Sequence, residues 1–235
     1  MRVENQPAFI LHHYPYRDTS QILDLLTRDF GRLSVVSRGS LAARSKLKSI
    51  LQPFRLLNVS WVGKGDMPTL INAELAELKP VLLDGRRLTS GFYLNELMMH
   101  FLQRHDFQED LFQLYANTVS WLATDTSLEI VLRIFEKRLL DALGVGLNLT
   151  HDADSGEAIK PDNQYIYFIE HGPVLALSGD MSSQQRPLLN GESLLAFSRD
   201  ELGSEAIRRE IKSLMRHVIA FYLAGKPLRS RELFR

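Results

Sequence analysis

The sequence contains no cysteine among its 235 residues. Disulfide bonds, catalysis by a thiolate and zinc sites built from cysteine sulfur are therefore excluded. Long apolar runs are also absent, because no apolar stretch approaches the ~20 residues that a membrane-spanning helix needs. The first residues, MRVENQPAFILHHYPYRD, lack the apolar segment and the cleavage site of a signal peptide. From these absences we expect a cytoplasmic protein with no membrane segment.

Acidic residues are missing from the stretch between Phe30 and Gly65, which nevertheless holds seven basic residues. The whole chain is neutral, with 28 basic and 28 acidic side chains, so the rest of it carries 21 basic and 28 acidic ones, a net charge of −7. A local positive field attracts polyanions, because each phosphate neutralised by lysine or arginine releases condensed counterions. A solvated basic surface without a ligand is the alternative interpretation. The seven candidate contacts are Arg32, Arg38, Arg44, Lys46, Lys48, Arg55 and Lys64.

Recognisable catalytic motifs are missing as well. The glycines near Lys64 lack the spacing of a Walker A loop, and no GxSxG nucleophile elbow occurs. The segment HDADSGE, from His151 to Glu157, places one histidine and three carboxylates within seven residues, a set that could bind a hard cation. We interpret this segment as a polar loop. A metal-dependent nuclease or phosphoesterase that uses the carboxylates from Asp152 to Glu157 is the alternative.

The first third of the chain predicts five short strands. They lie in PAFILHHY, in the two halves of TSQILDLLTRDFGRLSVVSRG, in FRLLNVSWV and in PTLINAELAEL. Gly31 can supply the positive φ of a tight hairpin, and Gly63-Lys64-Gly65-Asp66 marks a second hairpin. The basic connection SLAARSKLKSILQ favours either a mobile loop or a short helix. Phe30 and Trp61 could stack on bases, but we expect each of them to pack in the core or against a hairpin.

Five short antiparallel strands in ~75 residues suit an OB-fold, with an SH3-like barrel as the main alternative. On an OB-fold, Arg32 and Arg38 would lie on the third strand. The connection that follows this strand would carry Arg44, Lys46 and Lys48. We therefore expect an OB-fold DNA-binding domain over residues 1–79.

Beyond Pro80 the apolar spacing changes from two residues to three or four, which predicts helices. Apolar stripes indicate three helices within residues 84–105, 108–123 and 127–144, with Gly144 ending the third. Two more are predicted near Glu192–Phe197 and Glu205–Leu223. An irregular, glycine-rich insertion at about 146–187 contains a small β-hairpin around His171-Gly172. The predicted fold class is α+β: a five-stranded barrel, then a helical domain over residues 80–235 with this hairpin insertion.

Four segments in order are similar to the bacterial RecO recombination-mediator family. They are AFILHHYPYRDTSQILDLLTRDFGRLSVVSRGSLAARSKLKSILQPF, GFYLNELMMHFL, LRIFEKRLLDALGVGLNLTHDADSGEA and the terminal GKPLRSRELFR. The resemblance implies an N-terminal OB-fold, a helical C-terminal domain and a non-enzymatic role in DNA repair at the nucleoid. It implies binding of single- and double-stranded DNA, strand annealing, cooperation with RecR, and loading of RecA onto DNA covered by single-stranded DNA-binding protein (SSB).

The resemblance also implies a docking site for the acidic C-terminal tail of SSB on the helical domain. Such a tail needs an apolar pocket rimmed by cations. Arg133 in LRIFEKRLL matches the family's arginine in this helix, and Leu128, Leu132 and Phe135 could line the pocket. The alternative is that Arg133 pairs with Glu129 and that the three apolar side chains belong to the core.

The sequence departs from part of the family in one loop. Some members carry a four-cysteine zinc module after a GxGxN segment. Here this loop reads THDADSGEAIKPDN and contains no cysteine. We therefore expect no zinc and no cofactor, and we expect the hairpin and the neighbouring helices to hold the loop.

Overall fold

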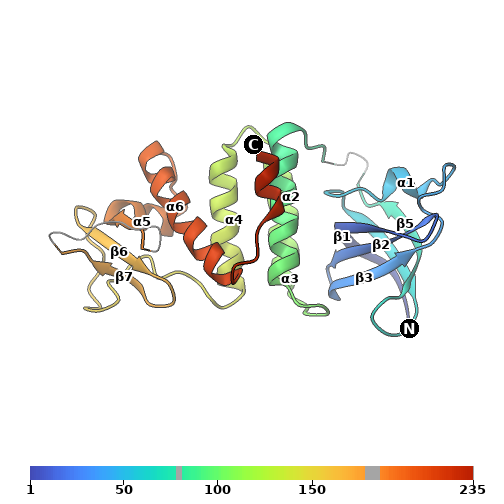
Figure 1. Cartoon of the computed structure of the whole chain (residues 1–235), viewed down its shortest axis with the longest axis horizontal. Helices are drawn as coiled ribbons and strands as arrows, with labels where there is room; N and C mark the ends of the chain where they lie inside the picture. The colour runs from blue at the N-terminus through green and yellow to red at the C-terminus, as the bar shows by residue number, and fades with distance from the viewer. Residues whose placement is uncertain (78–80, 178–185, 235) are drawn as a thin grey trace. The chain divides into compact units, whose positions relative to one another are not determined.

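The computed structural model describes residues 1–77, 81–177 and 186–234. The chain forms two compact units, Met1–Asp125 with Leu228–Arg235, and Thr126–Pro227. The first unit thus contains the barrel, the two helices that follow it and the end of the chain. The predicted domain boundary at residues 79 and 80 lies outside the described residues. The predicted α+β class is confirmed (Figure 1).

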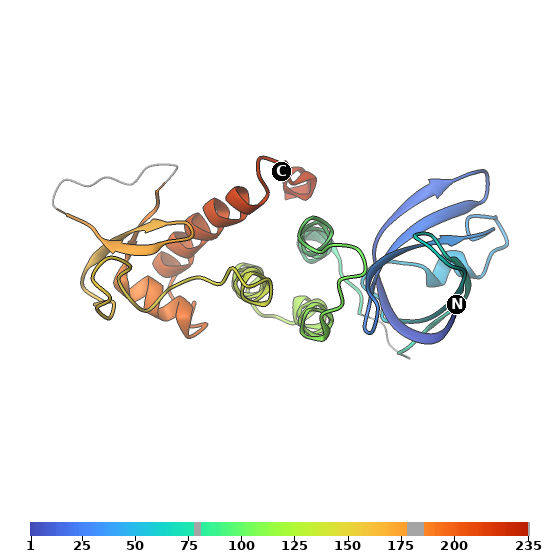
Figure 2. The ribbon, with the colours of Figure 1, turned by 90° about the horizontal axis from the view of Figure 1, so that it is seen from below.

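Five strands form a closed barrel in the first unit, in the order β1-β2-β3-β5-β4 (Figure 2). Neighbouring strands are antiparallel except β3 and β5, which meet in parallel at Val36 and Thr69. The ring closes because β1 is long enough to pair with β2 along one part and with β4 along another. The strands are β1 Arg2–Tyr16, β2 Ser20–Thr27, β3 Gly31–Ser37, β4 Leu57–Val62 and β5 Thr69–Leu75.

Glycine at the predicted turns has the predicted conformation. Gly31 has φ +63°, and Gly63 and Gly65 between β4 and β5 also have positive φ. Gly31 serves a second purpose, because a Cβ built on it would lie 2.2 Å from the backbone oxygen of Asp106. A side chain at this position would therefore force apart the β2–β3 hairpin and the segment that follows α2.

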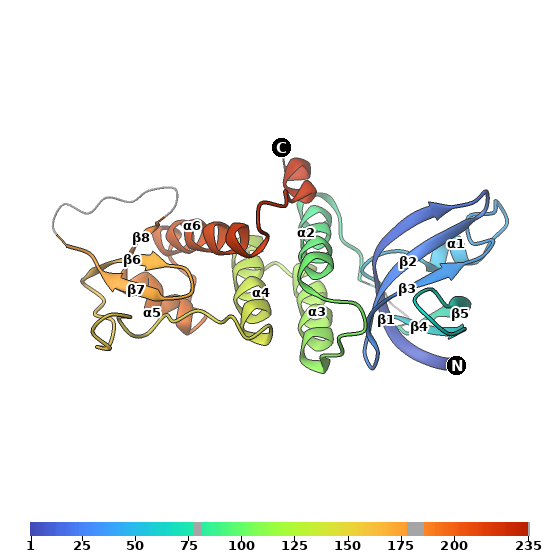
Figure 3. The ribbon, with the colours of Figure 1, turned by 60° about the horizontal axis from the view of Figure 1, so that its bottom comes forward.

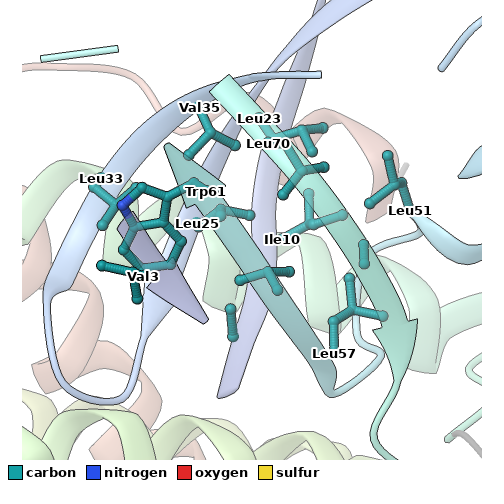
Figure 4. Packing of buried hydrophobic residues seen from close by; sticks show 13 residues of the cluster. Val3, Ile10, Leu23, Leu25, Leu33, Val35, Leu51, Leu57, Trp61 and Leu70 are labelled. Carbon is teal, nitrogen blue, oxygen red and sulfur yellow. The ribbon is translucent and has the colours of Figure 1, made fainter. Parts of the chain in front are cut away.

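Buried apolar residues of all five strands build the barrel core (Figure 4). They alternate along β2, β3 and β4, and register shifts interrupt the alternation where β4 pairs with β1 and β5. Trp61 is 4% exposed, and its ring meets that of Phe30 edge to face with centroids 5.3 Å apart. The expectation that Trp61 packs in the core is confirmed, and Phe30 is partly buried against the same cluster. The Trp61 ring is therefore not accessible to a base.

The basic connection between β3 and β4 contains one helical turn, α1 Leu47–Ile50. Leu47 and Ile50 pack against the barrel core, and Leu51 is buried in it. Of the two structures considered for this segment, the short helix is correct, because these apolar residues have the barrel interior to cover.

Two helices of the first unit, α2 Gly85–Phe101 and α3 Glu109–Leu122, pack on β1. Asn95 of α2 donates its side-chain amide to the Leu11 carbonyl (2.8 Å) and accepts the buried Tyr115 hydroxyl (2.5 Å). The chain end forms a 3-10 helix, η1 Arg229–Phe234. Its first backbone N–H groups donate to the Glu96 carboxylate. These contacts make barrel, helices and chain end one body.

The second unit packs helix α4 Leu128–Ala142 against α6 Glu205–Tyr222, with α5 Gly191–Ser198 beside α6 (Figure 3). The predicted hairpin is confirmed as β6 Gln164–Phe168 and β7 Gly172–Leu175. A third strand, β8 Leu188–Asn190, pairs with the other edge of β6 and was not predicted. Residues 178–185 of the predicted insertion lie outside the described residues. Gly144 follows α4 with φ +77°, as expected for a residue that ends a helix.

Candidate nucleic-acid interface

Four of the predicted contacts, Arg38, Arg44, Lys46 and Lys48, lie between β3 and β4, with Lys48 in α1, and all four are exposed. Arg38 was expected on the third strand, but β3 ends at Ser37. Among the residues that the structure describes, none of the four forms an ion pair. Unpaired, solvated cations keep their full charge available for a phosphate backbone. We define these four residues as the basic connection.

Backbone hydrogen bonds attach the basic connection to the β1–β2 turn. The amide of Leu41 donates to the Thr19 carbonyl (2.8 Å), and the amide of Gly39 donates to the Ser20 hydroxyl (3.4 Å). Together with the burial of Leu51, these bonds fix both ends of the segment that carries the charges. The positive surface is therefore a property of the folded barrel.

The two predicted contacts beyond α1, Arg55 and Lys64, differ in exposure. Arg55 is half-buried, and its guanidinium donates to the Ser49 carbonyl (2.6 Å), so it supports the α1 segment. Lys64 is exposed at the tip of the β4–β5 turn.

Arg32 has a partner inside the protein. Its Nη1 atom donates to the carbonyls of Met99 (2.7 Å) and Leu102 (2.9 Å) at the C-terminal end of α2. The last carbonyls of a helix have no partner within it and carry partial negative charge, so a cation there is favourable. Burial lowers the pKa of Arg32, and the nearby Asp24 carboxylate partly offsets this effect. This side chain joins β3 to α2.

Replacing Arg32 by methionine should lower the free energy of unfolding by about 2 kcal/mol, because two carbonyls lose a charged donor. Replacing Arg38 by methionine is the matched control: it lies just beyond β3, is exposed, and should change stability by less than about 0.5 kcal/mol. Urea unfolding of both variants measures the difference. Equal stability of the two variants would show that the α2 contact contributes nothing.

Tertiary structure adds three exposed arginines that the sequence did not single out: Arg17, Arg104 and Arg229. Arg17 lies in the β1–β2 turn that holds the basic connection. Arg104 pairs with Arg32 in an isolated backbone bridge, and Arg229 begins η1. Each lies outside residues 30–65 in the sequence, where its neighbours include acidic residues. No local pattern could have connected them with the basic stretch.

In the second unit, Arg133 is 8% exposed and its Nη2 atom lies 2.6 Å from Oε1 of the fully buried Glu136. Glu129, the partner considered from the sequence, pairs instead with Lys212 of α6. Leu128 is half-buried, whereas Leu132 and Phe135 are buried in the core. The surface that these four residues offer is therefore small.

The Asp152 carboxylate organises the loop that was considered as a metal site. Oδ1 accepts the Asp154 amide and both the amide and the hydroxyl of Ser155, and Oδ2 accepts the Leu175 amide (2.7 Å). Burial alone would raise the pKa of Asp152, but the hydrogen bonds from Ser155 and Leu175 lower it below the ordinary value. Within the described ranges, no group of three or more histidine or carboxylate side chains could hold a metal ion.

Two family models account for nearly the whole chain. The model described as "Recombination protein O N terminal" matches residues 1–78, and "Recombination protein O C terminal" matches residues 82–232. The chain belongs to the RecO family. This is a family of DNA repair proteins, so the exposed cations of the first unit belong to a protein of DNA repair and recombination.

Relatives in the RecO family match this chain over most of their own length. A DNA repair protein RecO of Dechloromonas aromatica is 44% identical over 237 residues, which cover 100% of this chain and 96% of the relative. Those of Ralstonia nicotianae and Nitrosococcus oceani are 42% and 41% identical, and the matches cover 99% of this chain and 84% and 93% of those proteins. Among the described helices of this RecO-family chain, none has the length and apolar character needed to cross a bilayer.

Proposed function

We propose that this chain is a non-enzymatic recombination mediator of the nucleoid that binds single- and double-stranded DNA and anneals complementary strands. In this role it acts with RecR and helps to load RecA onto SSB-coated DNA. The observation that carries the proposal is the basic connection: four exposed cations on an anchored segment, without an ion pair in the described part of the chain. Membership of the RecO family supports the same role.

The barrel is proposed to be an OB-fold. Its strand order β1-β2-β3-β5-β4, the parallel contact of β3 with β5 and the helix between β3 and β4 support this assignment. OB-folds bind oligonucleotides on the face of strands 2 and 3 and on adjoining loops. The basic connection begins at the end of β3, next to that face.

Annealing requires two phosphate backbones to approach each other. Cations that contact phosphates without reading bases can screen this repulsion for any sequence. Arg38, Arg44, Lys46 and Lys48 are suited to this task, because their side chains are solvated and their backbone is fixed. Lys64 is proposed as a weaker contact, and Arg55 and Arg32 as supports of the surface.

The SSB tail is proposed to dock on the second unit. Arg133 can take part only by sharing its guanidinium with Glu136, beside the accessible part of Leu128. A hollow of about 700 Å³ along α6 offers more accessible cations, because it is lined by Arg209, Lys212 and Arg216. Titration of a labelled tail peptide against Lys212→Gln/Arg216→Gln and against Arg133→Met/Glu136→Leu distinguishes the two positions.

The function is tested by annealing complementary strands that are coated with SSB. The protein should accelerate duplex formation, since it contributes cations to both backbones, and added Mg²⁺ should produce no cleavage. Labelled strands followed on a native and a denaturing gel report both outcomes. Cleavage activity that stays with the protein through purification would favour the nuclease alternative, in which the two oxygens of Asp152 would have to give up hydrogen bonds.

A further inference from the structure

The C-terminal half of β1 carries a row of rings on the outside of the barrel. His12, Tyr14 and Tyr16 alternate along the strand, so their side chains share one face. His12 and Tyr14 are in contact, with ring centroids 4.2 Å apart. Tyr14 is 43% exposed. We define these three residues as the ring row.

The neighbouring strands leave the ring row open and hold Tyr14 in place. Its cross-strand neighbour is Ile22, and the next position along β2, Asp24, pairs with His12. The Asp24 carboxylate accepts the hydroxyl of Ser34 on β3 (2.5 Å) and is also hydrogen-bonded to the Tyr14 hydroxyl. Burial, and then the Asp24 charge, raises the pKa of Tyr14. The phenol therefore stays neutral, and its ring is oriented before any ligand binds.

Exposed guanidinium groups flank the ring row. At the Tyr16 end, Arg17 lies over the Tyr16 ring, 5.1 Å from its centroid. Arg38 is next to Gly39, whose amide donates to the Ser20 hydroxyl at the start of β2. At the other end, Arg104 acts electrostatically on Tyr14 and Arg229 on His12. Within the part of the chain that the structure describes, no ion pair involves any of these four arginines.

We propose that the ring row is a stacking site for the bases of single-stranded DNA, with Tyr14 as the principal platform. This inference rests on the proposed DNA binding and assigns it a second element besides the basic connection. An exposed ring between cations is complementary to a ligand with both flat apolar faces and negative charge. Single-stranded DNA has both, because its bases are unpaired, whereas a duplex hides its base faces in the stack.

With such a site, one barrel would bind both forms of DNA and would bind single strands more tightly. Phosphates of either form meet the basic connection and the flanking arginines. Only a single strand can in addition place a base on Tyr14, and base–aromatic stacking does not depend on sequence. A DNA strand that stacks a base on Tyr14 and places phosphates on the basic connection would have its backbone held along the sheet.

Replacing Tyr14 by alanine should weaken binding of an oligo-dT strand about 10-fold, within the range of about 5- to 100-fold that the loss of one stacked base produces. Tyr14→Phe keeps the ring and should bind within about twofold of the parent. Phe221→Ala is the matched control, because Phe221 is an exposed ring of the second unit, 48% exposed. Fluorescence anisotropy with labelled strands measures all four proteins.

An abasic oligonucleotide of the same length separates stacking from charge. The parent should prefer oligo-dT to the abasic strand, and Tyr14→Ala should lose this preference while keeping its abasic and duplex affinity. Equal oligo-dT affinity of Tyr14→Ala and parent, or an equal loss for oligo-dT and abasic strands, would overturn the stacking site. A different result would show that the basic connection does not contact phosphates: the salt dependence of binding would stay unchanged after its cations are removed.

Discussion

Replacing Arg44, Lys46 and Lys48 together by glutamine should weaken single-strand binding about 100-fold at 0.1 M salt. Each phosphate contact on single-stranded DNA contributes about 0.7 to the slope of log K against log salt concentration, so the slope should become shallower by about 2. All three side chains are exposed, and among the described residues none has a carboxylate partner. Their removal should therefore change binding and leave folding intact. Anisotropy titrations at four or five salt concentrations measure affinity and slope together.

The matched control removes the same charge from elsewhere. Arg2, Lys160 and Arg199 are exposed, and each already pairs with a neighbouring carboxylate: Glu4, Glu157 and Glu201. Their triple glutamine variant also loses three positive charges, but the slope should stay within about 0.5 of the parent value, since no phosphate contact is lost. If both triple variants lost affinity to the same extent, net charge would account for binding and the basic connection would not.

Replacing Arg133 by alanine should lower the free energy of unfolding by about 3 kcal/mol. Glu136 is fully buried, and its Oε1 atom lies 2.6 Å from the Arg133 guanidinium. Removing one member of a buried pair is costly, because the other charge stays in a medium of low dielectric constant. Urea unfolding should show a lower midpoint with an unchanged m-value.

Two further variants show whether the cost comes from the buried charge. Arg133→Met/Glu136→Leu removes both charges and should return stability to within about 1 kcal/mol of the parent, as apolar replacements of buried pairs often do. Glu129→Gln, also on α4, breaks the half-exposed pair with Lys212 of α6 and should cost less than about 1 kcal/mol. Equal losses for Arg133→Ala and Glu129→Gln would show that burial of Glu136 does not determine the cost.

Loss of the buried pair would also affect binding of the SSB tail. Arg133→Ala combines loss of a cation with a destabilised second unit, so weaker tail binding by this variant would have two causes. The charge-free double variant keeps the helix packed and removes only the cation. It is therefore the variant with which a role of Arg133 in tail binding is decided.

Local patterns were most informative where one residue type is nearly obligatory. Gly31, Gly63 and Gly65 marked two hairpins, because only glycine adopts positive φ without cost, and all three have it. The alternation of apolar residues in β3 placed Leu33 and Val35 in the core. The strand β8 was missed because its three residues give too short a pattern and it pairs with β6 across an intervening segment.

The residues of the candidate interface were only partly predictable. The deficit of acidic residues located Arg38, Arg44, Lys46 and Lys48, since a charge imbalance is visible in one dimension. The same count included Arg32, which the structure assigns to the end of α2. It could not include Arg104 or Arg229, because these approach the ring row only after β1, α2 and the chain end have packed together. Arg17 follows Tyr16 directly and lies outside the basic stretch, so the same count missed it as well.

By itself, the sequence determined the α+β class, the family, the turns of the barrel and the position of its unopposed positive charge. These depend on residue type and short-range spacing, which are complete in the primary structure. Only the tertiary structure decided which cations face solvent and which bind carbonyls or buried carboxylates. Hydrogen bonds and desolvation depend on distances of a few ångströms between residues that can be 70 positions apart, as Arg32 and Leu102 are.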